Sequence, residues 1–399
     1  MLLPYNKGLP YVMSLFFELI RVATRRQERL SRMPSTEEWQ ELYSMAETHA
    51  LLGVCFSGIR QLEQQGLHIP KGLYYQWLTI AAQIQQRNEM LNKQCFAACS
   101  KVEKAGFKAC VLKGQGIAQL YGPELAMLRQ CGDIDLWVDG GMKNALIWAR
   151  EQYGNVRFDY INAHLPMFKR TEVELHYRAS FMTNLIENRK LQRWLIRHEQ
   201  ELTCSKVELP NGIGKIPVPS LSFNIYYVLL HCYNHMFSEG LGLRQIMDLY
   251  FVLVQGSCVP MEVSSQRSSE KLKKIVNEDY KGFFLKELEL YKFASAMMWI
   301  LGYVFEMNRE TMICEPDENE GRYILEEILQ NGNFGHYDKR VKNIKGRYRA
   351  KVLARIVQHN SHLAKHYPSK LYWNLIWLCW HFIWKRSQIC VSTQLLLRS

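Results

Sequence analysis

Two aspartates separated by one residue, Asp133 and Asp135, interrupt the largely apolar run of residues 129–139 (RQCGDIDLWVD). Side chains of a β-strand alternate between its two faces, so both carboxylates point to one face, about 7 Å apart along the chain. Carboxylate oxygens are the ligands that Mg²⁺ prefers. The pair is therefore a candidate metal site, although the same spacing is also common on ordinary solvent-facing strands.

A second polar pair lies in the alternating segment of residues 171–177 (TEVELHY), where Glu174 and His176 share one face. If this strand neighbours the strand with the two aspartates, three carboxylates meet on one surface. Such carboxylates raise one another's pKa values unless a cation neutralises them, which favours a bound metal. For His176 two interpretations stay open: it contacts phosphate or tunes Glu174, or it only ends the polar face of the strand.

The turn Lys113-Gly114-Gln115-Gly116 lies between a short apolar segment, residues 107–112, and a segment of helical character. Glycines let backbone N–H groups approach an anion closely, and a helix N-terminus favours phosphate. Taken alone, the sequence could be only a tight turn. Its position twenty residues before Asp133 favours a phosphate-binding turn.

These residues, in this order, resemble the polymerase-β-like nucleotidyltransferase superfamily and, within it, an uncharacterised bacterial nucleotidyltransferase family. The resemblance spans about residues 37–255. The residues that carry it are Leu112-Lys113-Gly114, Tyr121, Arg129, Gly132-Asp133-Ile134-Asp135-Leu136 and Glu174-Leu175-His176. Further matches are the pattern from Trp39 to His49, the helix pair with His231, His235, Leu243-Arg244-Gln245 and Asp248, and the turn Gly332-Asn333-Phe334-Gly335. The turn departs from the superfamily, where a Gly-Ser or Gly-Gly pair is usual.

The resemblance implies transfer of a nucleoside monophosphate from an NTP to an unidentified hydroxyl or phosphate acceptor. Two Mg²⁺ ions are expected, bound by Asp133 and Asp135, with Glu174 completing the shell of one and helping to deprotonate the acceptor. The residues Lys113, Gly114, Gln115 and Gly116 would cradle phosphate, and Arg129 would neutralise the leaving pyrophosphate. The alternative is a catalytically silent nucleotide-binding protein that retains the fold.

A helix pair after residue 220 contributes further candidates: His231, His235, Arg244 and Asp248. The two histidines are one helical turn apart, a spacing that zinc can use, but no third ligand is evident nearby. Two other interpretations stay open. The pair lines the nucleotide or acceptor cleft, or the histidines are hydrogen-bonded residues of the core.

The helices and strands expected around these residues indicate an α+β protein, with a nucleotidyltransferase-type mixed sheet between helical regions. The four expected segments are a helical region (1–105), the α/β core (106–218), a helical domain that completes the cleft (219–335) and a basic, aromatic helical segment (336–399). The segment Ser35-x-x-Glu38 predicts a helix start by a capping box. Residues 315–321 are expected to form a loop and residues 331–335 a turn.

The C-terminal segment carries the whole charge excess. Residues 339–399 hold 13 Lys/Arg and no Asp or Glu, whereas the rest of the chain has 37 basic and 38 acidic residues. Its aromatic helix, taken as 14 residues and about 21 Å, is too short to span a bilayer. Residues 339–386 would contact an anionic membrane surface or nucleic acid, or the aromatic helix packs on the helical domain, which is the favoured interpretation.

Composition is that of a globular protein, with 48% hydrophobic and 22% charged residues, which argues against general disorder. Residues 1–26 read as an amphipathic helix, because Glu18 interrupts the apolar run and no cleavage-site pattern follows. The eleven cysteines lack the paired spacing of a disulfide or zinc framework. A cytoplasmic location is expected, with peripheral association at the inner membrane as an option.

Overall fold

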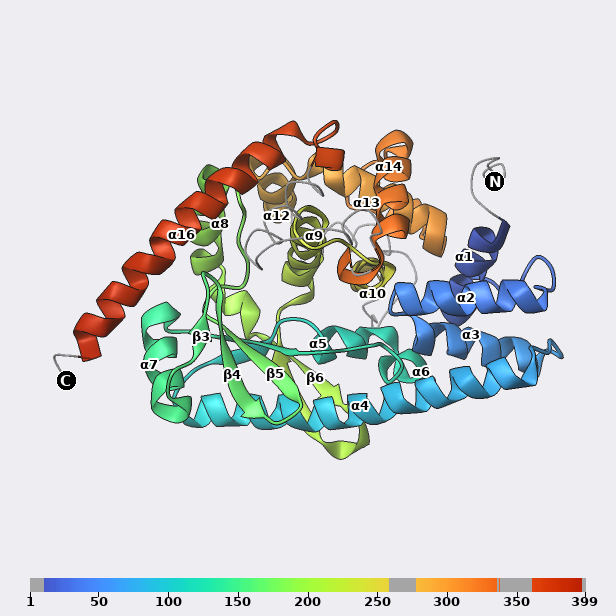
Figure 1. Cartoon of the computed structure of the whole chain (residues 1–399), viewed down its shortest axis with the longest axis horizontal. Coiled ribbons are helices and arrows are strands. Elements are labelled where there is room, and N and C mark those ends of the chain that lie inside the picture. Colours follow the sequence, from blue (N-terminus) through green and yellow to red (C-terminus); the bar gives the residue numbers. More distant parts are fainter. Residues whose placement is uncertain (1–10, 258–277, 336, 338–360, 397–399) are drawn as a thin grey trace, which may run out of the picture.

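The computed structural model describes residues 11–257, 278–335, 337 and 361–396. It is an α+β structure, which confirms the predicted fold class: a mixed five-stranded sheet lies among helices, with a separate two-stranded sheet beside it (Figure 1).

The five-stranded sheet has the order β1-β2-β5-β4-β3. Its strands are β1 (Ala109–Val111), β2 (Ile134–Val138), β3 (Arg157–Phe158), β4 (Asn162–Phe168) and β5 (Thr171–His176). β2 and β5 pair in parallel, and the other neighbours pair antiparallel. The two strands that carry the acidic motifs are therefore direct neighbours, as the sequence argument required.

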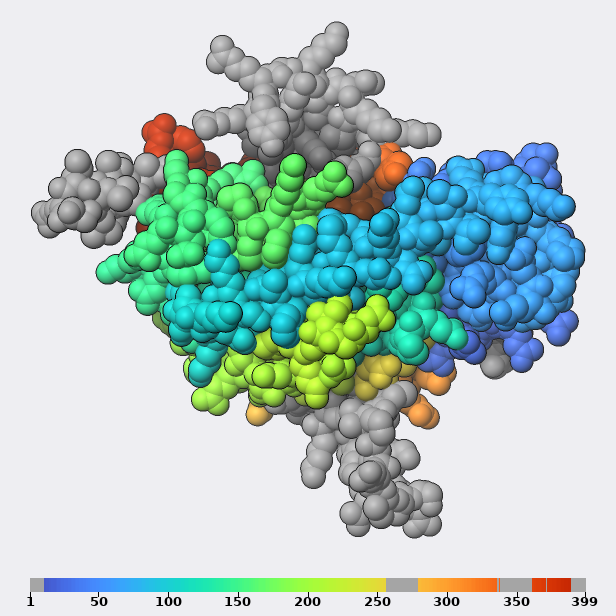
Figure 2. Space-filling view, turned by 90° about the horizontal axis from the view of Figure 1, so that it is seen from below, coloured from blue at the N-terminus to red at the C-terminus, as the bar shows by residue number. Residues whose placement is uncertain are grey.

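The two faces of this sheet differ in polarity. Apolar strand residues such as Ile134, Leu136 and Leu175 form one core with α4 (Lys71–Lys104) and α7 (Gly141–Tyr153). Since side chains alternate along a strand, the polar residues between them point to the opposite face. Figure 2 shows α4 crossing the side of the molecule that closes the apolar face. The polar face is thus left available for a site.

The N-terminal region is helical, as predicted, with α1 (Tyr11–Ala23), α2 (Thr36–Thr48) and α3 (Leu52–Gln64) before α4. The capping box is confirmed: the Ser35 hydroxyl accepts from the Glu38 N–H, and the Glu38 carboxylate accepts from the Ser35 N–H. Helix α4 ends at Lys104, and Gly106 follows with a φ of +91°, a conformation that favours glycine.

A second group of helices comprises α9 (Leu221–Phe237), α10 (Leu243–Ser257), α13 (Tyr291–Phe305) and α14 (Glu318–Asn331). These helices share one hydrophobic core with the N-terminal helices, in which Phe16, Trp39 and Phe293 are almost fully buried. Packing therefore joins two regions that are far apart in sequence, and the four-segment division stays a prediction.

Several elements were not predicted from the sequence. Helix α8 (Leu185–Arg197) and the hairpin of β6 (Ser205–Leu209) and β7 (Gly214–Val218) follow the main sheet. The short elements that were also not predicted are α6 (Pro123–Ala126), η2 (Glu199–Leu202), η3 (Pro210–Gly212), α12 (Glu278–Lys281), η4 (Gly282–Glu287) and η5 (Arg309–Thr311). The helical character expected after Lys113 is confirmed by α5 (Gln115–Ala118) and η1 (Gln119–Tyr121), and η6 (Asn333–Gly335) lies in the expected turn.

The expected loop at residues 315–321 is partly wrong, because α14 begins at Glu318. The Asp317 carboxylate caps this helix by accepting from the Glu320 N–H. Acidic residues in the first turn are favourable next to the positive end of the helix dipole, so the acidic run is a helix start. The turn after Asn331 is confirmed.

The C-terminal helix α16 (Pro368–Leu396) has 29 residues, so the expected length of 14 was too short. Trp377, Trp380 and Trp384 surround the Tyr160 ring at centroid distances of 5.2 to 5.4 Å. The favoured interpretation, packing on the helical domain, is therefore wrong for the tryptophans, which pack on the loop between β3 and β4 of the α/β core. The start of α16 does contact the helical domain, because Asn374 Nδ2 donates to the Phe237 carbonyl of α9. No helix in the described ranges meets the length and hydropathy needed to span a membrane.

Candidate active site

The register of β2 and β5 places Asp135 directly opposite Glu174. Glu174 and His176 are two residues apart on β5, so both side chains are on its polar face. His176 therefore also lies next to Asp135. One ligand atom from each of Asp135, Glu174 and His176 lies within 4.8 Å of the others. Parallel pairing in this register therefore converts two separate sequence motifs into one cluster.

Lys113 joins this cluster from the other side. The Leu112 N–H donates to the Asp135 carbonyl, which continues the pairing of β1 with β2 past the end of β1. As a result, the Lys113 ammonium lies 2.9 Å from Asp135 Oδ1. Gly114 has a φ of +56° and a ψ of −115°, a conformation that residues with a Cβ rarely adopt. The backbone conformation at Gly114 therefore explains why this position of the turn is a glycine.

The carboxylate of Asp135 is buried with two cationic partners. His176 Nε2 lies 3.0 Å from Asp135 Oδ1, in addition to the Lys113 contact. Burial alone would raise the pKa of Asp135, but Lys113 and His176 outweigh it and hold this pKa below its ordinary value. Burial would likewise lower the pKa of His176, but its bonds to Asp135 and Glu174 raise it to about 9. In this geometry His176 is an imidazolium at neutral pH.

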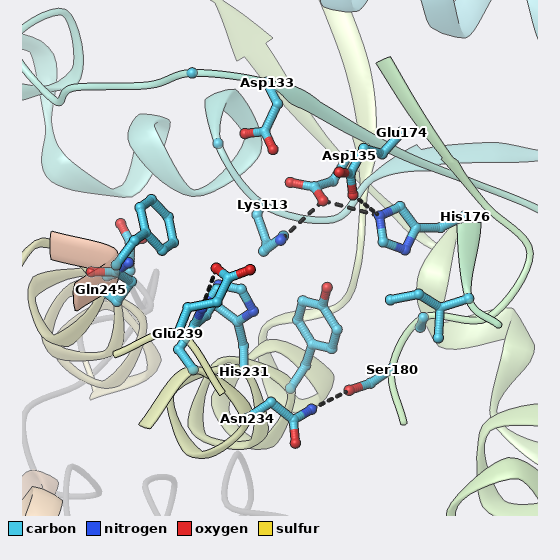
Figure 3. A pocket seen from close by; sticks show the side chains of 18 of the residues that line it. Lys113, Asp133, Asp135, Glu174, His176, Ser180, His231, Asn234, Glu239 and Gln245 are labelled. Atoms are coloured by element: carbon cyan, nitrogen blue, oxygen red, sulfur yellow. Dashed lines mark hydrogen bonds and ion pairs between the residues drawn. The ribbon is translucent and has the colours of Figure 1, made fainter. Parts of the chain in front are cut away.

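Asp133 differs from Asp135 in its surroundings. It precedes β2, its side chain is exposed at the cavity, and it forms no ion pair with any described residue. The neighbouring Asp135 charge, together with burial of part of the site, raises its pKa. Figure 3 shows Asp133 directed into the same space as Lys113 and Asp135. Asp133 is thus the carboxylate whose charge is least compensated.

Two residues of β4 that were not predicted from the sequence lie next to Glu174, and one of them, Asn162, hydrogen-bonds to it. Asn162 Nδ2 donates to Glu174 Oε2 at 2.5 Å. His164 Nδ1 lies 3.8 Å from Glu174 Oε1, but its closer partner is Glu172 Oε1 at 2.6 Å. Both come from β4, which pairs antiparallel with β5 so that His164 is opposite Glu174. Burial raises the pKa of Glu174, but His176 outweighs this and the pKa is lowered. The alternation Asn162-x-His164 was the sequence signal that could have revealed them.

The residues present fit a divalent metal ion. Asp133, Asp135 and Glu174 offer oxygen donors, the donor type suited to Mg²⁺. The compact group of potential ligands in the described residues nevertheless contains His176 in place of Asp133. Asp135 Oδ1 lies 3.0 Å from His176 Nε2, whereas Asp133 precedes β2 and its carboxylate is not in this group. A protonated His176 would act as a hydrogen-bond donor to these carboxylates, not as a metal ligand.

The second half of the predicted phosphate turn does not reach the site. The Gln115 side chain is buried and donates to Asn92 Oδ1 at 2.6 Å on α4. A Cβ at Gly116 would lie 2.9 Å from Val218 Cγ1, so this glycine permits close packing of α5 on β7. The Gly116 N–H already donates to the Lys113 carbonyl. Only Lys113 and Gly114 of the turn line the cavity.

Arg129 and Asp248 form a buried ion pair. Arg129 Nε and Nη2 donate to the two Asp248 oxygens at 2.7 and 2.6 Å, and the Tyr121 hydroxyl donates to Asp248 Oδ1 at 2.7 Å. These contacts join the segment before β2 to α10. Arg129 also lines the cavity, but its guanidinium is occupied by Asp248. Its predicted role at the pyrophosphate stays a prediction.

Helices α9 and α10 form the wall opposite the strands. A cavity of about 610 Å³ is lined by the acidic cluster on one side and by His231, His235, Arg244 and Asp248 on the other. Figure 3 shows His231, Asn234, Glu239 and Gln245 across from Lys113 and Asp135. The structure thus brings all the helix-pair candidates to the same cavity as the aspartates.

The histidine pair does not gather further ligands. The rings of His231 and His235 are 4.3 Å apart, but neither histidine belongs to a group of three potential metal ligands in the part of the chain that the structure describes. Burial lowers the pKa of both, that of His235 to about 3, so both are neutral at pH 7. The placement fits a cleft wall better than a zinc site.

The alternation that places Asp135 on the polar face of β2 also places Trp137 there, where it would stack on a base or only pack against the sheet. Trp137 is buried in the core and does not line the cavity. Tyr227 and Asn234 line the cavity without having been predicted, whereas Gln245 and Phe334 line it from two segments that the resemblance includes. Tyr227 and Asn234 lie on α9, where no polar alternation marks them, so tertiary packing identifies them.

The family model described as uncharacterised nucleotidyltransferase matches residues 35–265. A solved structure, an antigenic nucleotidyltransferase-like protein from Paracoccidioides brasiliensis, has 15% sequence identity and a TM-score of 0.29. That similarity covers 49% of this chain and 91% of the other. No curated protein matches the chain. Because the family model covers more than half of its length, the chain belongs to the uncharacterised nucleotidyltransferase family.

Proposed function

We propose that this protein is a Mg²⁺-dependent nucleotidyltransferase that moves a nucleoside monophosphate from an NTP to an acceptor hydroxyl or phosphate. The observation that carries the proposal is the register of β2 and β5, which sets Asp135 opposite Glu174 in the cavity that Asp133 and Lys113 also line. In the overall reaction, the acceptor oxygen bonds to the α-phosphorus, the bond to the β-phosphate oxygen breaks, and pyrophosphate and the acceptor proton leave.

Asp133, Asp135 and Glu174 would hold the metal ions. When bound, two Mg²⁺ ions supply charge stabilisation for the transferred phosphoryl group and lower the pKa of the acceptor hydroxyl. Lys113, on the turn at Gly114, would contact the triphosphate once its partner Asp135 binds metal. Glu174, positioned by Asn162, would receive or orient the acceptor proton. His176 would fix the orientation of both neighbouring carboxylates.

Pyrophosphate release from each of the four NTPs with Mg²⁺ tests the proposal. Asp135→Asn should abolish Mg²⁺-dependent turnover in the presence of the acceptor, and unchanged turnover would contradict the assignment. Labelled NTPs incubated with cell extract would identify the acceptor. Nucleotide binding in calorimetry without pyrophosphate release from any acceptor would favour the catalytically silent alternative.

The C-terminal segment supports a second, separable property. The exposed side chains of α16 include Tyr372, Leu375, Phe382 and Ile383, which leaves an apolar stripe on the side away from the packed tryptophans. Residues 338–360, which contain most of the basic side chains, lie outside the described residues. We propose that residues 339–386 associate with an anionic membrane or nucleic acid, and that the protein has a cytoplasmic location. Liposome co-sedimentation and a salt-dependent RNA titration test the association.

A further inference from the structure

Two glycine turns, distant in sequence, pack backbone to backbone on the helical wall of the cavity. A Cβ at Gly240 would lie 2.7 Å from the Gly335 nitrogen, and one at Gly242 would lie 2.9 Å from the Asn333 Cα. No residue with a Cβ fits either position without movement of the facing backbone. The turn between α9 and α10 and the turn after α14 therefore hold each other in place.

This packing fixes Phe334 in an uncommon conformation. Its φ of +53° is in the left-handed region, which non-glycine residues rarely adopt, and such residues gather at functional sites. The half-buried Phe334 side chain lines the cavity. The Arg244 guanidinium carbon lies 5.3 Å from the centre of its ring, and the His235 ring centre lies 5.0 Å away. The cavity thus has an aromatic surface on the side opposite the acidic cluster.

A directed hydrogen-bond donor lies in the same wall. Gln245 is 1% exposed and lines the cavity. Its Oε1 accepts from the Gly242 N–H at 3.2 Å, which sets the orientation of the amide. Its Nε2 is buried and has no hydrogen-bond partner among the described residues. An unpaired buried donor costs free energy, so a ligand that accepts a hydrogen bond here would be favoured.

We propose that Phe334 and Gln245 form the subsite for the nucleobase of the donor NTP. The base stacks on the Phe334 ring, and Gln245 Nε2 donates to a carbonyl oxygen or ring nitrogen of the base. The triphosphate then extends toward Lys113 and the carboxylates across the cavity, whose size is that of a small-molecule site. The neutral His231 and His235 add no charge to this part of the wall. This inference rests on the proposed function and names the part of the site that binds the base.

The test compares two ligands, ATP and inorganic tripolyphosphate, each with Mg²⁺, by calorimetry on the full chain. The variant is Phe334→Asn, because asparagine tolerates the left-handed backbone and removes the ring. ATP binding should weaken about tenfold or more, the usual effect of losing one base–aromatic stack. Tripolyphosphate binding should not change. Phe334→Trp keeps an aromatic ring at this position and should bind ATP with about the wild-type affinity.

Gln245→Glu gives an independent measurement, since it keeps an acceptor for the Gly242 N–H but removes the donor. It should weaken binding of ATP more than that of tripolyphosphate. Phe382→Asn, on the exposed side of α16, is the matched control and should alter neither affinity. Equal loss of both ligands in Phe334→Asn, or no loss of ATP binding, would overturn the subsite. Failure of the wild-type chain to bind either ligand would instead count against the proposed function.

Discussion

The carboxylates of Asp135 and Glu174 come from strands about forty residues apart, yet β2 and β5 pair them residue to residue, and the His176 imidazole contacts both. Asp135 also receives the Lys113 ammonium. This arrangement gives each acidic residue a distinct environment. It therefore predicts different consequences for substitutions that look chemically alike.

Asp135→Asn and Asp133→Asn should differ in stability. The first leaves Lys113 and the buried His176 without their shared partner, and breaking a buried ion pair costs about 3 kcal/mol or more. The second removes an unpaired carboxylate with a raised pKa, so the free energy of unfolding should stay the same or rise slightly. Urea unfolding at pH 7 in EDTA measures both. Equal destabilisation would contradict the assigned contacts.

Glu174→Gln should retain the fold and lose catalysis. The amide can still accept from Asn162 but cannot take up a proton, so kcat should fall about 100-fold or more. Glu208→Gln, on the exposed face of β6, is a matched strand control and should keep wild-type turnover. The assay is steady-state pyrophosphate release. A wild-type kcat in Glu174→Gln would remove this residue from the mechanism.

The ion pair between Arg129 and Asp248 should contribute more to stability than the hydrogen bond that the Tyr121 hydroxyl donates to Asp248. Asp248→Asn weakens a buried bidentate pair and should destabilise the protein by about 3 kcal/mol. Tyr121→Phe removes one hydrogen bond and should cost about 1 kcal/mol. The double variant Arg129→Met/Asp248→Leu should be less destabilised than Asp248→Leu alone, because no unpaired charge remains. Thermal and urea unfolding of the four variants decide this, and a double variant no more stable than Asp248→Leu would contradict it.

Gly240→Ala and Gly66→Ala separate backbone strain from steric overlap. Both glycines have positive φ, but a Cβ at Gly66 meets nothing within 4 Å, whereas one at Gly240 approaches Gly335. Gly66→Ala should cost about 1 kcal/mol, the strain alone. Gly240→Ala should cost clearly more and should also weaken nucleotide binding, since it moves the turn that carries Phe334. Similar stability losses would mean that the two turns are not in tight contact.

His49 should make stability depend on pH. It is fully buried next to Phe16, and burial lowers its pKa to about 4. Below pH 6.5 the unfolded chain binds a proton that the folded chain excludes until about pH 4, so stability falls with decreasing pH in this range. The loss between pH 7 and pH 5 should be about 2 kcal/mol. His49→Gln should lack this component; the same pH slope in both proteins would exclude it.

The sequence by itself determined the local features of this protein. Alternation placed Asp133 and Asp135 on one face and Glu174 and His176 on another strand's face, because strand periodicity is a property of neighbouring residues. The capping box at Ser35 and the strand, turn and helix around Lys113 followed for the same reason. The resemblance then gave the family, and the fold class agreed with the structure.

Only the tertiary structure decided which residues meet. The register that sets Asp135 against Glu174, the support of Glu174 by Asn162, and the pairing of Arg129 with Asp248 all depend on contacts between distant segments. Gln115 and Gly116 turned away from the cavity because α4 and β7 pack against them. Phe334 and Gln245 reached it because two glycine turns approach more closely than any Cβ allows. Such contacts follow from the packing of whole helices and sheets, and no spacing along the chain encodes them.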